Sequence, residues 1–145
     1  METIRVHSEF HAAHRQLEYP GKCRHVHGHT WKGSIVVRTE RFPRNALDMS
    51  VDFGDLKKIL KDMDHKMLVS ETDEAFAAGG EFEDEGVVVI PGVNPSVENV
   101  ADYCLAEIEG VIRSQYPDKG IAYHIEVTIQ ETDNNIFVSD REVTI

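Results

Sequence analysis

The sequence predicts an α+β fold, a four-stranded antiparallel sheet with two helices packed on one face, in the order ββααββ. Three observations support this prediction. Segments near both ends of the chain alternate between apolar and polar side chains, as half-buried strands do. Two segments in the middle carry apolar residues at spacings of three and four, as amphipathic helices do. Because no predicted strand separates the helices, an antiparallel sheet is expected.

The first two strands are expected at residues 4–14 and 29–39. Residues 4–14 place mostly apolar side chains on one parity and polar ones on the other. Residues 29–39 repeat the alternation after a Pro-Gly turn at residues 20–21. Strands joined through such a turn are expected to pair antiparallel.

The two helices are expected in the middle of the chain. Residues 52–68 form the first, with Asp52 or Gly54 near its start. Its apolar residues recur every three or four positions, at Leu56, Ile59, Leu60, Met63 and Met67. The second and longer helix is expected to begin at Ser96 and to end near Tyr116.

The segment between the helices, residues 70–86, holds seven acidic residues and a Gly-Gly pair. This composition predicts a mobile, solvated loop. Residues 121–132 and 134–143 alternate again and predict the last two strands, with a turn between them. Since a chain of 145 residues has the length of one ordinary domain, residues 1–145 are expected to form a single domain.

The overall charge excludes two classes of partner. A net charge of −11 and a pI near 5.1 would repel nucleic acids and anionic membranes over most of the surface. The longest apolar stretch, GVVVIPGV, is too short to span a bilayer, and no signal peptide pattern follows Met1. The two cysteines, Cys23 and Cys104, are expected to stay reduced. A cytoplasmic protein is therefore expected.

Three histidines, His14, His27 and His29, are the candidate metal ligands. Each lies at the end of an expected strand on the parity of apolar residues, and antiparallel pairing can bring His14 beside the other two. Three imidazoles with an open fourth position suit a catalytic zinc ion. Ordinary polar histidines at strand ends are the alternative. His7 and His11 lie on the polar parity and are assigned no role.

Motifs along the whole chain resemble those of the 6-pyruvoyl-tetrahydropterin synthase and 6-carboxy-tetrahydropterin synthase family. One is the spacing from Cys23 through three residues to the His-Gly-His of residues 27–29. The others are FHAAHR (10–15), VDFGDLK (51–57), MDHKML (63–68), NPSVENVA (94–101) and ETDNNI (131–136).

The resemblance implies the tunnelling fold, with subunits that assemble through their sheets into homo-oligomeric rings, a trimer-based ring or a hexamer. Active sites in this family usually lie at subunit interfaces. The implied cofactor is Zn²⁺ held by His14, His27 and His29. The implied substrate is a small pterin, 7,8-dihydroneopterin triphosphate, whose three-carbon side chain reacts while zinc acts as a Lewis acid.

The resemblance also implies three residues that move protons. Cys23 is expected to be the general base, because it stands four residues before His27 and outside the metal's coordination sphere. Asp64 and His65 are expected to form a relay in which the carboxylate orients the imidazole. The alternative for Cys23 is a fourth ligand in a closed, structural zinc site.

Substrate contacts are expected from four charged residues. Glu131 shares the parity of the apolar side chains of its strand, and a carboxylate there needs a partner, which the N–H and amine of a pterin ring would supply. Glu98 would contact the pterin or complement the dipole of the second helix. Arg15 and Lys66 stand beside metal and relay residues and would meet the triphosphate.

The three-residue gap between Cys23 and His27 resembles that of the carboxy-forming members of the family. The resemblance implies the reaction that releases acetaldehyde and triphosphate and gives 6-carboxy-5,6,7,8-tetrahydropterin for queuosine-type deazaguanine biosynthesis. The alternative within the family is the pyruvoyl-forming reaction, which eliminates triphosphate and keeps all side-chain carbons. An alternative of another class is a non-enzymatic binding module stabilised by zinc, with Cys23 as a metal ligand.

Overall fold

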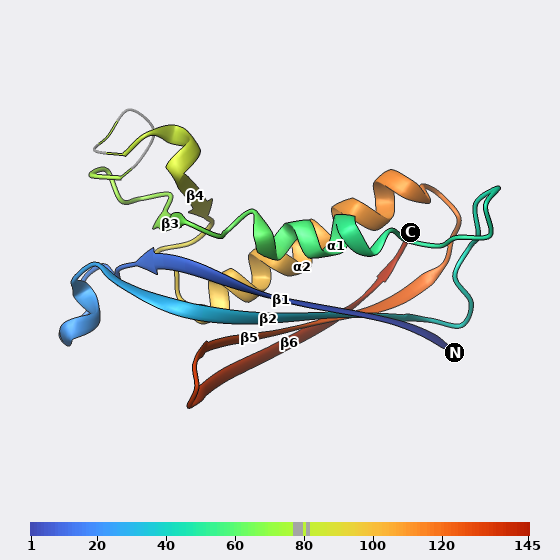
Figure 1. Cartoon of the computed structure of the whole chain (residues 1–145), viewed down its shortest axis with the longest axis horizontal. Helices are drawn as coiled ribbons and strands as arrows, with labels where there is room; N and C mark the ends of the chain where they lie inside the picture. The colour runs from blue at the N-terminus through green and yellow to red at the C-terminus, as the bar shows by residue number, and fades with distance from the viewer. Residues whose placement is uncertain (77–79, 81) are drawn as a thin grey trace.

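The computed structural model describes residues 1–76, 80 and 82–145, and within them six strands form one mixed sheet (Figure 1). The strands are β1 (Glu2–His14), β2 (His27–Thr39), β3 (Lys66–Ser70), β4 (Val87–Ile90), β5 (Ala122–Thr132) and β6 (Asn135–Thr144). Their spatial order is β4-β3-β1-β2-β5-β6. Two helices, α1 (Phe53–Lys61) and α2 (Val97–Gln115), lie over the same face of the sheet.

The four predicted strands form the antiparallel part of this sheet. β1 and β2 pair along their whole length, from Glu2 opposite Thr39 to His14 opposite His27. β5 pairs antiparallel with both β2 and β6. β2 begins two residues earlier than expected, so both histidines of the His-Gly-His motif belong to a regular strand. Their side chains therefore point to the same face.

The prediction of a purely antiparallel, four-stranded sheet is wrong, because β3 pairs parallel with β1 and β4 pairs parallel with β3. β3 begins at Lys66, inside the range predicted as the first helix. That helix ends at Lys61, and His65 has a φ of 59°, a left-handed conformation that a helix cannot continue through. The order along the chain is therefore ββαββαββ.

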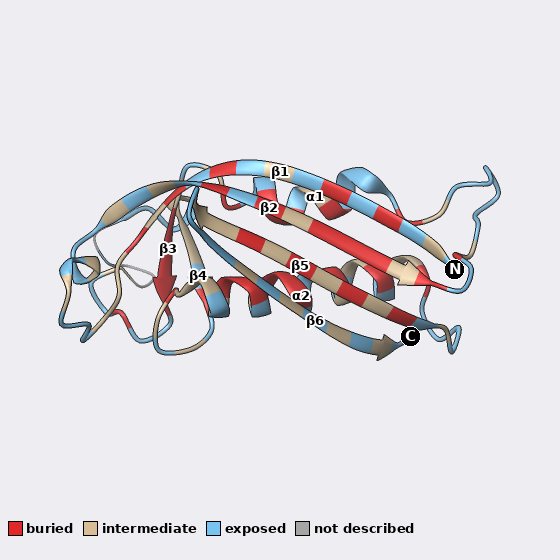
Figure 2. Ribbon diagram, turned by 90° about the horizontal axis from the view of Figure 1, so that it is seen from below, coloured by how far each residue is buried: buried red, intermediate tan, exposed pale blue. Residues whose placement is uncertain are grey.

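The core fills the space between the sheet and the two helices. Figure 2 shows buried residues alternating with more exposed ones along β1 and β5, as the sequence pattern predicts. Phe10 of β1 and Trp31 of β2 are fully buried, and their rings stack with centroids 5.7 Å apart. Leu60 of α1 and Ile108 of α2 cover this layer from the other side.

Each helix begins at a capping side chain. Asp52 accepts a hydrogen bond from the backbone N–H of Gly54 (2.6 Å), and Ser96 accepts one from that of Asn99 (3.2 Å). Because Ser96 is the cap and not the first helical residue, α2 starts at Val97. No helix in the described part of the chain is long and apolar enough to span a membrane.

The acidic segment between the helices is mostly exposed where the structure describes it, as expected, but parts of it are ordered. Ser70 ends β3, and Asp84–Gly86 form a short 3₁₀ helix before β4. Asp73 is buried, with 5% of its surface exposed. Residues 77–79 and 81, which belong to the predicted mobile loop, lie outside the described residues.

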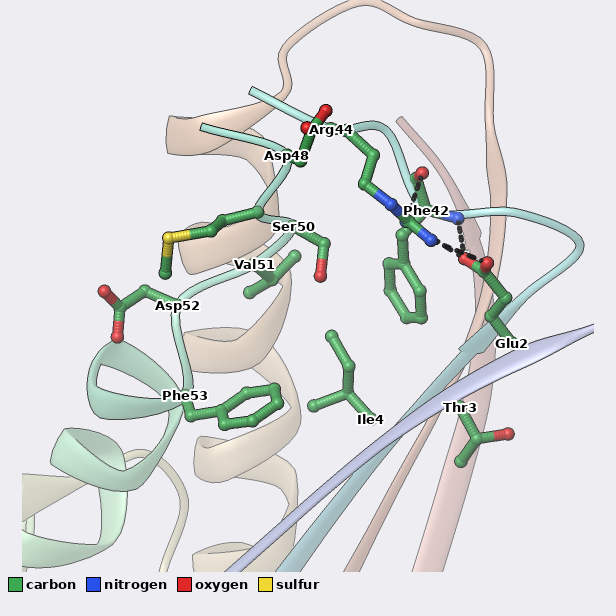
Figure 3. A pocket seen from close by; sticks show the side chains of 11 residues that line it. Glu2, Thr3, Ile4, Phe42, Arg44, Asp48, Ser50, Val51, Asp52 and Phe53 are labelled. Atoms are coloured by element: carbon green, nitrogen blue, oxygen red, sulfur yellow. Dashed lines mark hydrogen bonds and ion pairs between the residues drawn. The ribbon is translucent and has the colours of Figure 1, made fainter. Parts of the chain in front are cut away.

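A pocket of about 490 Å³ lies where β1 begins (Figure 3). Ile4, Phe42 and Phe53 line it, and Arg44 forms an ion pair with Glu2 at its edge (2.8 Å). His14, the candidate metal ligand on β1, lies at the other end of this strand, and a strand of 13 residues is about 40 Å long. This pocket is therefore not part of the candidate site.

Candidate metal centre

The structure brings the three predicted histidines together at one end of the sheet. His14 pairs with His27 in the register of β1 and β2, and His29 follows two residues along β2 on the same face. The ring centroids lie 4.7 Å apart for His14 and His27, 5.3 Å for His14 and His29, and 4.8 Å for His27 and His29. The rings stand on the face that carries the helices, next to Trp31.

Backbone carbonyls fix the tautomer of two of the rings. His14 Nδ1 donates to the carbonyl of Pro95 (2.7 Å), just before α2, and His27 Nδ1 donates to the carbonyl of His25 (2.7 Å). A nitrogen that donates to a carbonyl carries the ring's hydrogen, so Nε2 of each ring presents its lone pair. Metal-binding histidines are oriented in this way.

Burial keeps two of the imidazoles neutral. His14 is fully buried, and burial lowers its pKa to about 4. Burial also lowers the pKa of His29 and outweighs the opposing effect of Glu131. The Nε2 atoms of His14 and His29 are buried and make no hydrogen bond among the described residues. Neutral, converging and otherwise unsatisfied imidazole nitrogens are what a divalent metal ion requires.

Glu131 completes a group of four possible metal donors. One donor atom each from His14, His27, His29 and Glu131 lies within 4.8 Å of all the others. Glu131 stands near the end of β5, where the pairing with β6 shifts register between Gln130 and Thr132. Three imidazoles and a carboxylate fit zinc, and they also fit other first-row divalent ions. The alternation of β5 places Glu131 on the apolar face, but no pattern in the sequence places it beside the histidines.

Cys23 lies in the loop that leads into β2. It belongs to a 3₁₀ turn (Lys22–Arg24), is half-buried, and accepts a backbone hydrogen bond from Gln16 through its carbonyl (2.9 Å). It is not a member of the donor group found among the described residues, whose fourth donor is Glu131. Neither Cys23 nor Cys104 forms a disulfide.

Asp64 and His65 form a hydrogen-bonded pair, but on the other face of the sheet. His65 Nδ1 donates to Asp64 Oδ2 (2.8 Å), while Asp64 Oδ1 accepts from the backbone N–H of His11 (2.7 Å). That N–H is the main reason why the pKa of Asp64 is lowered. The rings of His65 and His11 meet edge to face at 6.2 Å. Since His11 is exposed between two buried residues of β1, the pair lies on the face away from the helices.

Two of the other three predicted substrate contacts, Arg15 and Lys66, have partners within the chain. Arg15 makes two hydrogen bonds to Asp73 (2.8 and 2.6 Å), and its guanidinium stacks on the ring of Phe76 at 4.6 Å. The Lys66 ammonium donates to the carbonyl of Glu85. Both basic residues therefore contact the acidic segment. Glu98 is exposed in the first turn of α2, where a carboxylate complements the helix dipole.

Comparison with known proteins identifies the family. A sequence model of the family described as 6-pyruvoyl tetrahydropterin synthase matches residues 3–142. The chain belongs to this family. The resemblance inferred from the motifs is therefore confirmed.

Curated relatives agree with this membership. A Synechocystis protein named 6-carboxy-5,6,7,8-tetrahydropterin synthase is 36% identical over 104 residues, which cover 61% of this chain and 78% of that protein. A Pyrococcus abyssi relative is 32% identical over 106 residues, 66% of each chain. The aligned segments span about two thirds of that relative's length (66%) and 39% of a Pyrococcus horikoshii relative.

The structure of Plasmodium falciparum 6-pyruvoyl tetrahydropterin synthase superposes with a TM-score of 0.67 at 21% identity and covers 98% of both chains. At this identity the likeness establishes the shared fold.

Proposed function

We propose that this protein is a zinc-dependent enzyme that converts 7,8-dihydroneopterin triphosphate to 6-carboxy-5,6,7,8-tetrahydropterin, with release of acetaldehyde and triphosphate. The observation that carries the proposal is the convergence of three oriented histidines beside a carboxylate, in a member of this family. The relative from Synechocystis is named for the carboxy-forming activity. The pathway is queuosine-type deazaguanine biosynthesis, in the cytoplasm.

The proposed ligands of zinc are His14, His27 and His29. When bound there, zinc supplies a Lewis acid that polarises oxygen atoms of the substrate's side chain. The buried surroundings of His14, whose pKa is about 4, keep this ligand unprotonated and ready to bind a metal at neutral pH.

The proposed proton carriers are Cys23, Asp64 and His65. Cys23 removes a proton from the three-carbon side chain as a thiolate. His65 accepts and returns protons while Asp64, hydrogen-bonded to its Nδ1, holds the ring in one orientation (2.8 Å). Glu131 accepts the N–H and amine hydrogens of the pterin ring. Arg15, Lys66 and Glu98 remain proposed rim contacts.

The position of the relay supports a site shared between copies of the chain. In one chain the Asp64–His65 pair lies on the face of the sheet opposite the three histidines. We therefore propose that a homo-oligomer, a trimer-based ring or a hexamer, supplies the relay of one copy to the metal ligands of another. Mixed oligomers of His27→Ala and His65→Ala chains should then regain part of the activity that each variant lacks. Mixtures of His27→Ala with His29→Ala serve as the control and should stay inactive.

The product decides which reaction of the family takes place. The carboxy-forming route cleaves a carbon–carbon bond, so each turnover should yield one acetaldehyde and one triphosphate. Incubation of the purified protein with dihydroneopterin triphosphate, followed by a coupled acetaldehyde assay and mass analysis of the pterin, tests this directly. Triphosphate release with a retained three-carbon side chain would assign the pyruvoyl-forming reaction, which the family's description names. Zinc retention without turnover would favour the binding module.

A further inference from the structure

The contact between His29 and Glu131 is close but is not a hydrogen bond. His29 Nε2 lies 3.2 Å from Glu131 Oε1, a distance at which the two atoms could bond. Yet His29 Nε2 is buried and has no hydrogen-bond partner among the described residues. The carboxylate oxygen therefore does not lie along the direction in which an N–H of the ring would point. The two atoms therefore approach each other without pointing at each other.

Two ligands of one metal ion have this relation. Zinc–nitrogen and zinc–oxygen bonds are about 2.0–2.2 Å long, so two ligand atoms of a tetrahedral site are separated by about 3.3 Å. Their lone pairs converge on the ion and not on the neighbouring ligand. The 3.2 Å separation of His29 Nε2 and Glu131 Oε1 matches this geometry. His14 and His27 fit the same geometry, because the four donor atoms all lie within 4.8 Å of one another.

The surroundings of Glu131 call for a cation. The side chains of His29 and Glu131 are 17% and 20% exposed, and His14 beside them is fully buried. Within the described residues, Glu131 forms no ion pair with a lysine or arginine. A largely buried carboxylate among imidazoles, with no lysine or arginine partner in the described residues, is costly unless an ion compensates its charge. A divalent metal at the centre of the four donors supplies that charge.

Metal binding and pterin binding by Glu131 exclude each other. A carboxylate that accepts two parallel hydrogen bonds from a pterin ring uses the syn lone pair of each oxygen, which is also the lone pair that a metal ion prefers, so the two partners compete for the same positions. The pairing of β5 and β6 shifts register between Gln130 and Thr132, an irregularity of the kind that re-aims a side chain, and Glu131 lies at this point. Glu131 can therefore hold either partner, one at a time.

We propose that Glu131 is the fourth ligand of the metal in the absence of substrate, and that the substrate's pterin ring draws this carboxylate away. This inference rests on the proposed function for the identity of the second partner, and on the structure alone for the first. The exchange opens the fourth position only when substrate is present. The site is thus closed at rest and becomes open, as catalytic zinc sites are, on substrate binding.

The test replaces Glu131 with glutamine in the full-length chain and follows the metal directly. The metal-free protein is titrated with Zn²⁺ in competition with a chelator, and with Co²⁺, whose visible absorption reports the number and kind of its ligands. Glu131→Gln should weaken Zn²⁺ binding by about tenfold or more and change the Co²⁺ spectrum. The matched control is Glu126→Gln on the same strand, whose carboxylate faces Arg38 at 3.4 Å and should leave both unchanged.

The exchange is tested with biopterin, an unreactive pterin. Biopterin should shift the Co²⁺ spectrum of the natural protein, and the shift should be absent in Glu131→Gln. If Glu131→Gln binds both metals with natural affinity and an unchanged spectrum, the ligand assignment is overturned, whatever the pterin does. If biopterin binds, by fluorescence quenching, without moving the natural spectrum, the exchange is overturned. If biopterin fails to bind and dihydroneopterin triphosphate is not turned over, while Glu131→Gln still weakens the metal, the ligand assignment holds and the proposed function fails together with the exchange.

Discussion

Acid should destabilise the metal-free protein through one buried histidine. The pKa of His14 is lowered from 6.5 to about 4, chiefly by burial. Below pH 6.5 the unfolded chain gains a proton on this ring and the folded chain does not, so stability present above pH 6.5 is lost as the pH falls toward 4. At about pH 5, a group with these two pKa values lowers the free energy of unfolding by about 2 kcal/mol. His29, whose pKa is also lowered, adds to the loss in the same direction.

Urea unfolding in the presence of a chelator, at about pH 7.5 and about pH 5, measures this loss. The variant His14→Asn keeps a side-chain N–H to donate to the Pro95 carbonyl and cannot titrate. The natural protein should lose about 2 kcal/mol more than this variant between the two pH values. His7→Asn, at an exposed position of β1, is the control and should behave as the natural protein does. Equal losses in natural protein and His14→Asn would refute the burial argument.

Two further substitutions give separate readouts. Gly33→Ala should lower the free energy of unfolding by about 1–3 kcal/mol, because the new Cβ would lie 2.5 Å from Cδ2 of the fully buried Leu60. The control is Gly110→Ala, on the exposed face of α2 with open space around it, which should not destabilise the protein. Equal urea midpoints for the two variants would contradict this reasoning. Cys23→Ala should keep its metal and its pterin affinity while turnover collapses, as metal analysis beside a rate assay would reveal, whereas loss of the metal would make Cys23 a ligand.

Four of the six strands could be predicted from the sequence because their alternation of apolar and polar residues is a local pattern, whereas β3 and β4 have no such pattern. β1, β2, β5 and β6 are long and alternate, so each reveals its buried face by itself. β3 has five residues and β4 has four, and Met63 and Met67 continue the spacing of α1 into β3. Their parallel pairing beside β1 depends on contacts distant in sequence, which alternation does not encode.

The candidate site divides along the same line. The convergence of His14, His27 and His29 follows from strand parity and one antiparallel pairing, and both could be predicted from the sequence. The closeness of Glu131 to His29 depends on the register between β2 and β5, which no local pattern reveals. The position of His65 on the opposite face depends on its left-handed backbone conformation, at a residue that sequence analysis assigned to a helix.

Metal content tests the central claim most directly, namely that the three histidines bind the metal ion on which the chemistry depends. The purified natural protein should contain about one zinc ion per chain. His27→Ala should remove it, together with the acetaldehyde-forming activity. The matched control, His25→Ala, changes an exposed side chain two residues away and keeps the carbonyl that accepts from His27 Nδ1 (2.7 Å), so it should retain the metal. Full zinc retention in His27→Ala, or equal loss in the two variants, would contradict the assignment of this site.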